Sequence, residues 1–202
     1  MSATSARDNA ISLARHDPKA ALARARTITD PWFRCQALAW VAWLTPDEGA
    51  FRPIIAESLK AAQGAADPYQ RVGASAWPLR ALIERRDGAR AVAAIRKALA
   101  SVPQIENPVS RADAMFLLFQ AVFPQGVQVR ADTLTVLMSA CGAAGTKGQR
   151  HLRDAALMLA AVDGATARQV VTAMREGRER RQTERRIAEG EAMEPRAFFW
   201  GA

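Results

Sequence analysis

Apolar residues recur every three or four positions along most of the chain, the spacing that places them on one face of an α-helix. No segment alternates apolar and polar residues for long enough to suggest a β-strand. Ala, Leu and Arg dominate the composition and β-branched residues are sparse, which favours helices as well. The pattern therefore predicts an all-α fold.

The apolar stripes come in pairs separated by short turns, such as those at Asp87-Gly88, Gln125-Gly126 and Asp163-Gly164. Residues 5–28 give a shorter opening pair, broken at Asp17-Pro18. The first stripe of each later pair contains Phe33, Ala37, Trp40, Val41 and Leu44, then Val72, Ala76, Leu79 and Ile83, then Met115, Leu118, Phe119 and Val122, and then Leu152, Ala156 and Leu159. Such pairs indicate antiparallel helices joined by tight turns.

A short motif marks the start of each pair. Asp30-Pro31-Trp32-Phe33-Arg34-Cys35-Gln36-Ala37 is echoed over 67–74 and 107–114, and more weakly over 149–156. An Asp or Asn side chain accepts hydrogen bonds from the free amides of a helix start, and the Pro that follows has no amide hydrogen to leave unpaired. Asp17-Pro18 and Thr45-Pro46 repeat this arrangement. We therefore expect a helix to begin at each of these places.

The motif carries a family resemblance. Its order of Asp-Pro, two residues, Arg, two residues and Ala resembles the first helix of HEAT-like repeats, and the two-helix units also resemble tetratricopeptide-type units. Pro78 resembles the kink often found in HEAT first helices. The likeness covers residues 30–174, with a longer spacing than the tetratricopeptide period and without that repeat's Trp, Gly and Tyr signature. It implies an α-solenoid that binds macromolecules, and it implies no specific activity.

The expected architecture is a right-handed α-solenoid of about four to five antiparallel helix pairs over residues 1–174. Its units are approximately 5–29, 30–66, 67–106, 107–147 and 148–174. Residues 175–202 are expected to form a charged helical extension with an aromatic C-terminal tail.

The charged extension carries six arginines and three glutamates between Arg175 and Arg186. One hypothesis is a solvated extension of the last helix, with pairs four residues apart such as Glu176 with Arg180. A second is an arm that places Arg175, Arg178 and Arg181 on phosphates or on an acidic protein. Disorder is a third.

Three adjacent aromatic residues, Phe198, Phe199 and Trp200, lie near the end of the chain, and exposing them to water is unfavourable. They are expected either to fold back on the chain, capping an open end or a groove, or to dock into a neighbouring subunit or a partner. Either way, truncation should matter.

Tryptophans also cluster on the helix predicted after Asp30. Trp40 belongs to its apolar stripe and is expected in the core. Trp32 and Trp43 fall off the stripe, which favours a position between units for one or both, or an exposed role as a contact residue.

One arginine occupies the equivalent position in every copy of the motif, at intervals of 37, 40 and 42 residues: Arg34, Arg71, Arg111 and Arg153. Stacked repeats would align these side chains into a ladder. A structural role is one reading, because Arg34 and Arg71 follow Asp30 and Asp67 by four residues and could pair with them. The other reading is a ligand-binding ladder, centred on Arg111 and Arg153 with Arg150 adjoining.

No set of residues predicts a catalytic or metal site. Cys35 and Cys141 lie in apolar runs without metal-ligand spacing and are expected to be reduced core residues. His16 and His151 belong to no catalytic motif. The glycine-rich segment 142–148 follows a helix and has Thr before Lys, unlike a phosphate-binding loop, so it is expected to be a turn. We expect no cofactor and no enzymatic activity.

The net charge is +8, yet only four of the 28 basic residues are lysines. An Arg- and Ala-rich balance also arises from a GC-rich genome, so the charge permits a nucleic-acid partner without requiring one. No apolar run approaches the roughly 20 residues that cross a bilayer, and the start lacks a signal peptide's apolar region. We expect a cytoplasmic protein with no membrane partner.

The leading functional hypothesis is a non-enzymatic module whose helical-repeat surface binds a protein or peptide, as an adaptor or scaffold. The alternative is a HEAT-like nucleic-acid binder that uses an Arg-lined surface and the basic C-terminal arm. A third hypothesis is a homo-oligomer in which the aromatic tail docks into a neighbouring subunit.

Overall fold

The computed structural model describes residues 2–200, except for the side chain of Val127. Within that part of the chain every regular element is a helix and no strand is present, which confirms the predicted all-α fold. The chain divides into two compact units. One combines the chain up to Val102 with the residues from Phe198 onward, and the other is Pro103–Ala197.

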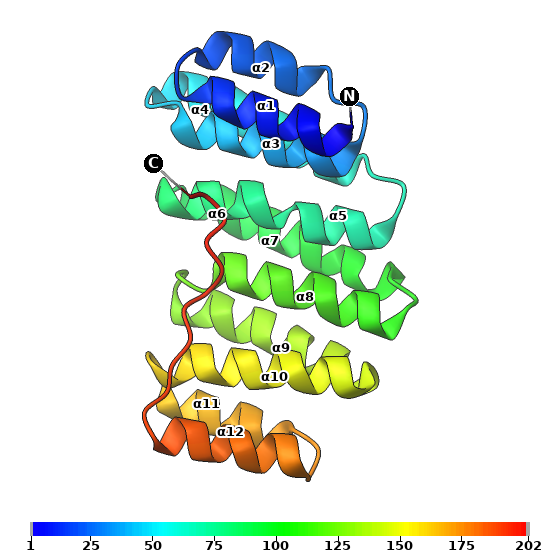
Figure 1. Cartoon of the computed structure of the whole chain (residues 1–202), viewed down its shortest axis with the longest axis vertical. Helices are drawn as coiled ribbons and strands as arrows, with labels where there is room; N and C mark the ends of the chain where they lie inside the picture. Colours follow the sequence, from blue (N-terminus) through cyan, green and yellow to red (C-terminus); the bar gives the residue numbers. More distant parts are fainter. Residues whose placement is uncertain (1, 201–202) are drawn as a thin grey trace. The chain divides into compact units, whose positions relative to one another are not determined.

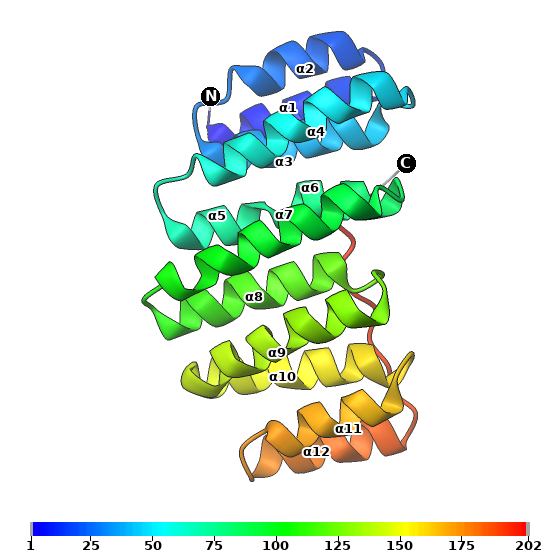
Figure 2. The same ribbon diagram turned by 180° about the vertical axis from the view of Figure 1, so that it is seen from behind.

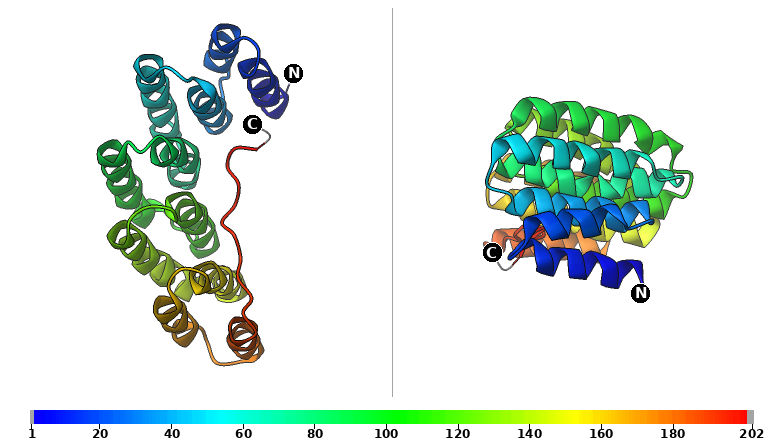
Figure 3. Two further views of the ribbon diagram at one scale, coloured as in Figure 1. Left: turned by 90° about the vertical axis from the view of Figure 1, so that its left-hand side faces the viewer. Right: turned by 90° about the horizontal axis from the view of Figure 1, so that it is seen from above.

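Helical hairpins build the first unit (Figure 1). Turns of three residues join α1 to α2, α3 to α4 and α6 to α7. A view along the helices shows two rows (Figure 3, left): one contains α1, α3 and α5–α6, and the other contains α2, α4 and α7. The second row lies nearer the viewer in Figure 2. The helices are α1 (Ala3–Ala14), α2 (Pro18–Arg26), α3 (Pro31–Leu44), α4 (Glu48–Gln63), α5 (Pro68–Ala74), α6 (Ala76–Glu84) and α7 (Gly88–Ser101), after which comes the 3-10 turn η1 (Val102–Gln104).

Two hairpins and a final helix form the second unit. Here α8, α10 and α12 make one row and α9 and α11 the other (Figure 3, left). The apolar residues predicted to face inward from its first helices are buried. The helices are α8 (Pro108–Val122), α9 (Val127–Ala143), α10 (Gly145–Ala160), α11 (Gly164–Ala173) and α12 (Arg178–Ala188).

Side-chain caps begin the helices at the Asp-Pro and Asn-Pro motifs, as predicted. The Asp30 carboxylate accepts hydrogen bonds from the amides of Trp32 at 2.9 Å and Phe33 at 3.3 Å. Such a cap contributes about 1 kcal/mol to helix stability. Caps of the same kind begin α2, α5 and α8, at Asp17, Asp67 and Asn107.

The helix start predicted at Thr45-Pro46 is wrong. Thr45 ends α3, and its hydroxyl donates a hydrogen bond to the Val41 carbonyl at 2.7 Å. The cap of α4 is Asp47, whose carboxylate accepts from the Ala50 amide at 2.6 Å. Because the Thr45 hydroxyl already bonds to a carbonyl of α3, Asp47 supplies the N-cap of α4 instead.

The first helix of the second copy is divided at Ser75 into α5 and α6. Pro78 has no amide hydrogen, so the Ala74 carbonyl four residues earlier lacks its helical partner. The Cys35 thiol on α3 donates to that carbonyl, with a sulfur–oxygen distance of 3.2 Å. Burial raises the pKa of this thiol to about 12, which keeps it protonated and able to donate. The carbonyl that Pro78 leaves without a helical partner is thus satisfied by a side chain of α3.

The charged segment after Met174 does not extend the last helix, contrary to one hypothesis. The chain turns at Gly177, where φ is +152°, and α12 then packs against α10 and α11. Thr183 is the residue of α12 that is buried. Glu176 falls in the turn, and Arg180 pairs with Glu184 at 3.0 Å instead.

Candidate functional site

The C-terminal tail, defined here as Phe198, Phe199 and Trp200, docks on the first unit of its own chain. Phe198 is only 1% exposed, and its ring meets the Trp77 ring edge to face, with centroids 5.4 Å apart. Trp77 lies on α6, and the last described residues of the chain run beside this helix in Figure 1. The tail therefore packs on its own chain, as one of the two predicted arrangements has it.

The next two tail residues bind to α3. The Phe199 ring stacks on Trp43, with centroids 4.9 Å apart and planes 10° apart, and it meets Trp40 edge to face at 5.2 Å. The Trp200 ring meets Trp40 at 4.9 Å but stays 52% exposed. Arg15, the residue that follows α1, donates a hydrogen bond from Nη2 to the Trp200 carbonyl at 2.9 Å. Both the rings and the main chain of the tail are therefore held.

The receiving surface, called here the aromatic site, consists of Trp40, Trp43 and Trp77. Trp40 and Trp43 stand three residues apart on α3 and are therefore neighbours on its surface. The Trp43 indole donates from Nε1 to Glu84 at 2.6 Å, and Arg80 donates from Nε to the other oxygen of that carboxylate at 2.5 Å. These bonds fix the ring on which Phe199 stacks.

A further aromatic pair supports the site. Trp32 stacks on Tyr69 with centroids 5.8 Å apart, and it meets Trp77 edge to face at the same distance. Trp40 is 1% exposed, as expected of a core residue. Trp32 and Trp43, which fall off the predicted stripe, contact Tyr69 on α5 and Glu84 on α6 respectively. The pairing of the tail with this cluster was not predicted, although each was identified separately.

Two arginines of the predicted ladder hold the turn before their own helix. Arg71 donates from Nη1 to the carbonyls of Ala65 and Ala66, both at 2.8 Å. Arg111 does the same at its equivalent position, donating from Nε to the Ile105 carbonyl at 2.8 Å. These contacts favour a structural role for both side chains.

The expected pairing of Arg34 and Arg71 with the aspartates four residues earlier is not found. Asp30 and Asp67 instead accept hydrogen bonds from amides of the first turn. Arg34 lies beside Arg26, Lys60 and other residues around a hollow of about 610 Å³. Because the carboxylates of Asp30 and Asp67 cap their helices, they do not pair with Arg34 and Arg71.

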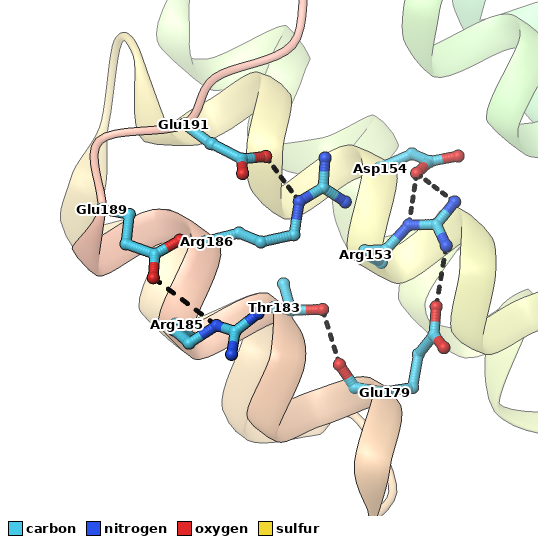
Figure 4. Close-up of polar contacts among 8 residues, drawn as sticks. All are labelled: Arg153, Asp154, Glu179, Thr183, Arg185, Arg186, Glu189 and Glu191. Carbon is cyan, nitrogen blue, oxygen red and sulfur yellow. Dashed lines mark hydrogen bonds and ion pairs between the residues drawn. The ribbon is translucent and has the colours of Figure 1, made fainter.

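Arg153 joins α10 to α12 (Figure 4). It donates from Nε to Asp154 at 2.7 Å and from Nη1 to Glu179 at 2.8 Å, and the hydrogen bond to Asp154 raises its pKa. The adjoining Arg150 is exposed and makes no ion pair with any residue between 2 and 200. The structure therefore does not bring Arg150 into the same contact as Arg153.

The candidate arm residues are all exposed: Arg178 and Arg181 lie in the first turn of α12, and Arg175 lies in the turn before it. The Arg175 main-chain amide donates to Gln149 at 2.9 Å, which anchors the turn before the helix. The aromatic site belongs to the first unit and these arginines to the second.

A buried histidine forms the other polar cluster of the second unit. His151 lies 2.6 Å from Asp113 through Nε2, and its ring stacks on Phe116 with centroids 4.4 Å apart. Lys147 approaches the same Asp113 oxygen at 3.3 Å. Burial lowers the pKa of His151 below its ordinary 6.5, although the bond to Asp113 acts in the opposite direction. Burial therefore favours the neutral form of this ring in the folded protein.

We expect the free energy of unfolding to fall as the pH is lowered below 6.5, because the unfolded chain takes up a proton that folded His151 resists. His151→Gln removes this titration while keeping an amide able to donate to Asp113. Urea unfolding between neutral pH and the mildly acidic range should give a flatter pH dependence for this variant. Equal slopes for His151→Gln and the wild-type protein would contradict the assignment.

Comparisons with known proteins give no family. No family model matches the chain, and neither curated proteins nor solved structures give a significant match. Among residues 2–200, no group of three or more His, Cys, Asp or Glu side chains is placed to hold a metal. No helix in the described chain is both long and apolar enough to cross a bilayer.

Proposed function

We propose that this chain is a non-enzymatic helical-repeat module that binds protein partners through extended peptides with adjacent aromatic residues. The observation that carries the proposal is the docking of Phe198 and Phe199 on the aromatic site. A surface that holds one such peptide offers the same ring faces, ring edges and main-chain donor to a peptide of a partner. Trp43, held in place by Glu84, supplies a stacking face that needs little rearrangement.

The proposed architecture is a right-handed α-solenoid of HEAT-like repeats. Support comes from the hairpins within each unit and from the capping motif at α3, α5 and α8. The shared contacts of Arg71 and Arg111 with the preceding turn add a repeated tertiary feature. A scaffold of this kind presents its helix rows as continuous binding surfaces.

The tail acts in this proposal as a built-in competitor. A segment tethered by a short flexible linker has an effective concentration on the order of 1 mM at its site. A partner peptide of equal intrinsic affinity would need a similar concentration to displace it. Physiological partners therefore bind more tightly than the tail or make a second contact elsewhere on the module.

The test measures binding of a fluorescently labelled peptide with the sequence of residues 195–202 to two full-length proteins. In wild type the tail occupies the site, whereas Phe198→Ala weakens that occupancy. If the tail is docked nine-tenths of the time, the variant should bind the peptide about tenfold more tightly. Fluorescence anisotropy gives both dissociation constants.

Two controls define the site. Trp43→Ala on the Phe198→Ala background should abolish binding, and a peptide with alanine in place of both phenylalanines should not bind. Failure of the intact peptide to bind the Phe198→Ala variant, once tail release is established by proteolysis, would refute the proposal. Binding of wild-type tails between copies would appear as a dimer in sedimentation and would favour the homo-oligomer hypothesis.

A further inference from the structure

Each acidic side chain of α12 and of the turn after it forms an ion pair, and Figure 4 shows those of Glu179, Glu189 and Glu191. Glu179 binds Arg153 of α10 at 2.8 Å. Glu184 binds Arg180 at 3.0 Å, and Glu191 binds Arg186 at 2.6 Å. These contacts neutralise the carboxylates and use up several of the arginines as well.

A different face of α12 is left with positive charge. At 100° per residue, Arg178, Arg181, Gln182 and Arg185 share an arc of about 100°. We call these four residues the outer face. They line a hollow of about 340 Å³. The helix thus separates a charge-neutral side, packed against its unit through Thr183, from a basic side.

The arginines of the outer face are available to a ligand. Arg178 and Arg181 are exposed and have no carboxylate within 4.0 Å among the described residues. Arg185 lies 3.5 Å from Glu189, but the two side chains are 71% and 57% exposed, so this pair is weak. Arg175 adds an exposed cation one turn before the helix.

We propose that the outer face of α12 binds the phosphate backbone of a duplex nucleic acid without sequence preference. The face has no apolar or aromatic residue, whereas the buried core of protein interfaces is enriched in them. Nucleic-acid interfaces are polar and strongly positive. Single-strand binding also requires aromatic platforms for the bases, and α12 contains no aromatic residue. The composition of the face therefore selects a duplex over both an acidic protein and a single strand.

The spacing of the arginines suits several phosphates. A rise of 1.5 Å per residue puts the Cα atoms of Arg178 and Arg185 about 10 Å apart, with Arg181 between them. Each guanidinium can donate two parallel hydrogen bonds to one phosphate. Two or three phosphate contacts follow, independent of the aromatic site and of the peptide binding proposed there.

The experiment titrates full-length protein into a labelled duplex of about 20 base pairs across a series of salt concentrations. The double variant R178Q/R181Q is compared with R52Q/R96Q, which removes the same charge from exposed positions on α4 and α7. At about 100 mM salt, R178Q/R181Q should bind at least about tenfold more weakly, and its slope of log affinity against log salt should shrink by about 2. The control should lose less than about twofold in affinity.

Circular dichroism melting establishes that both variants are folded. The absence of duplex binding by wild type at low salt would overturn the proposal, as would equal losses in the two variants, which would show diffuse attraction only. Tighter binding to a single strand or to a polyglutamate peptide than to the duplex would also overturn it, and would assign the outer face to that other partner.

Discussion

Replacing Phe198 with alanine is expected to release the C-terminal tail from the aromatic site. Phe198 is the most deeply buried residue of the tail, and truncating a buried phenylalanine costs about 3 to 5 kcal/mol. The loss of stability cannot exceed the docking free energy of the tail, because the tail can detach while the helices remain packed. We therefore expect a folded protein with a mobile C-terminus.

Limited trypsin digestion measures this release. Cleavage after the exposed Arg196 frees residues 197–202, which mass spectrometry detects. When opening is fast, cleavage follows the population of the open state, so Phe198→Ala should speed release by about tenfold or more. Trp200→Ala, at a residue that is half exposed, should have a smaller effect. Unchanged release from Phe198→Ala would show that the tail is not held through this ring.

The helix starts were predictable because the forces that set them are local. An Asp-Pro dipeptide contains the acceptor and the missing donor of a cap, so the starts of α2, α3 and α5 follow from a few residues each. Thr45-Pro46 shows where local reasoning fails. The Thr45 hydroxyl could serve either helix, and the end of α3 used it.

The aromatic site required information that no local pattern contains. Trp40 and Trp200 are 160 positions apart in sequence, and their contact depends on the tail returning to the first unit. The tail and the tryptophans each stood out because large aromatic rings avoid water. Sequence periodicity placed Trp43 outside the apolar stripe of its helix, where its ring is accessible to Phe199. The pattern could not show which residue would cover that ring.

For the four equivalent arginines, too, the sequence predicted the positions but not the contacts. Its regular spacing was visible, but the acceptors of Arg71 and Arg111 are main-chain carbonyls, which every residue possesses. Composition therefore gave no signal for them. The separation of charges around α12 also depends on Arg153, which lies on a different helix from the Glu179 that it binds.

Gly148→Ala is expected to destabilise the second unit strongly. A Cβ atom at this position would lie 2.1 Å from the Cys141 carbonyl oxygen and 2.8 Å from its carbonyl carbon. Both contacts are with the main chain of α9, so no side-chain rotation can relieve them, and α10 must move away. Forced overpacking costs typically about 1 to 3 kcal/mol, and a clash with main-chain atoms belongs at the upper end of that range.

Gly142→Ala is the matched control, on α9 itself and close in sequence. A Cβ there meets no atom within 4 Å, and the position is exposed and helical. Alanine should therefore stabilise the protein by about 0.5 to 1 kcal/mol, because it restricts the unfolded chain. Urea unfolding of both variants should give shifts of opposite sign. If both variants are more stable than wild type, the main chains of α9 and α10 are not in close contact at Gly148. If both are less stable, the effect of Gly148→Ala has a cause other than that contact.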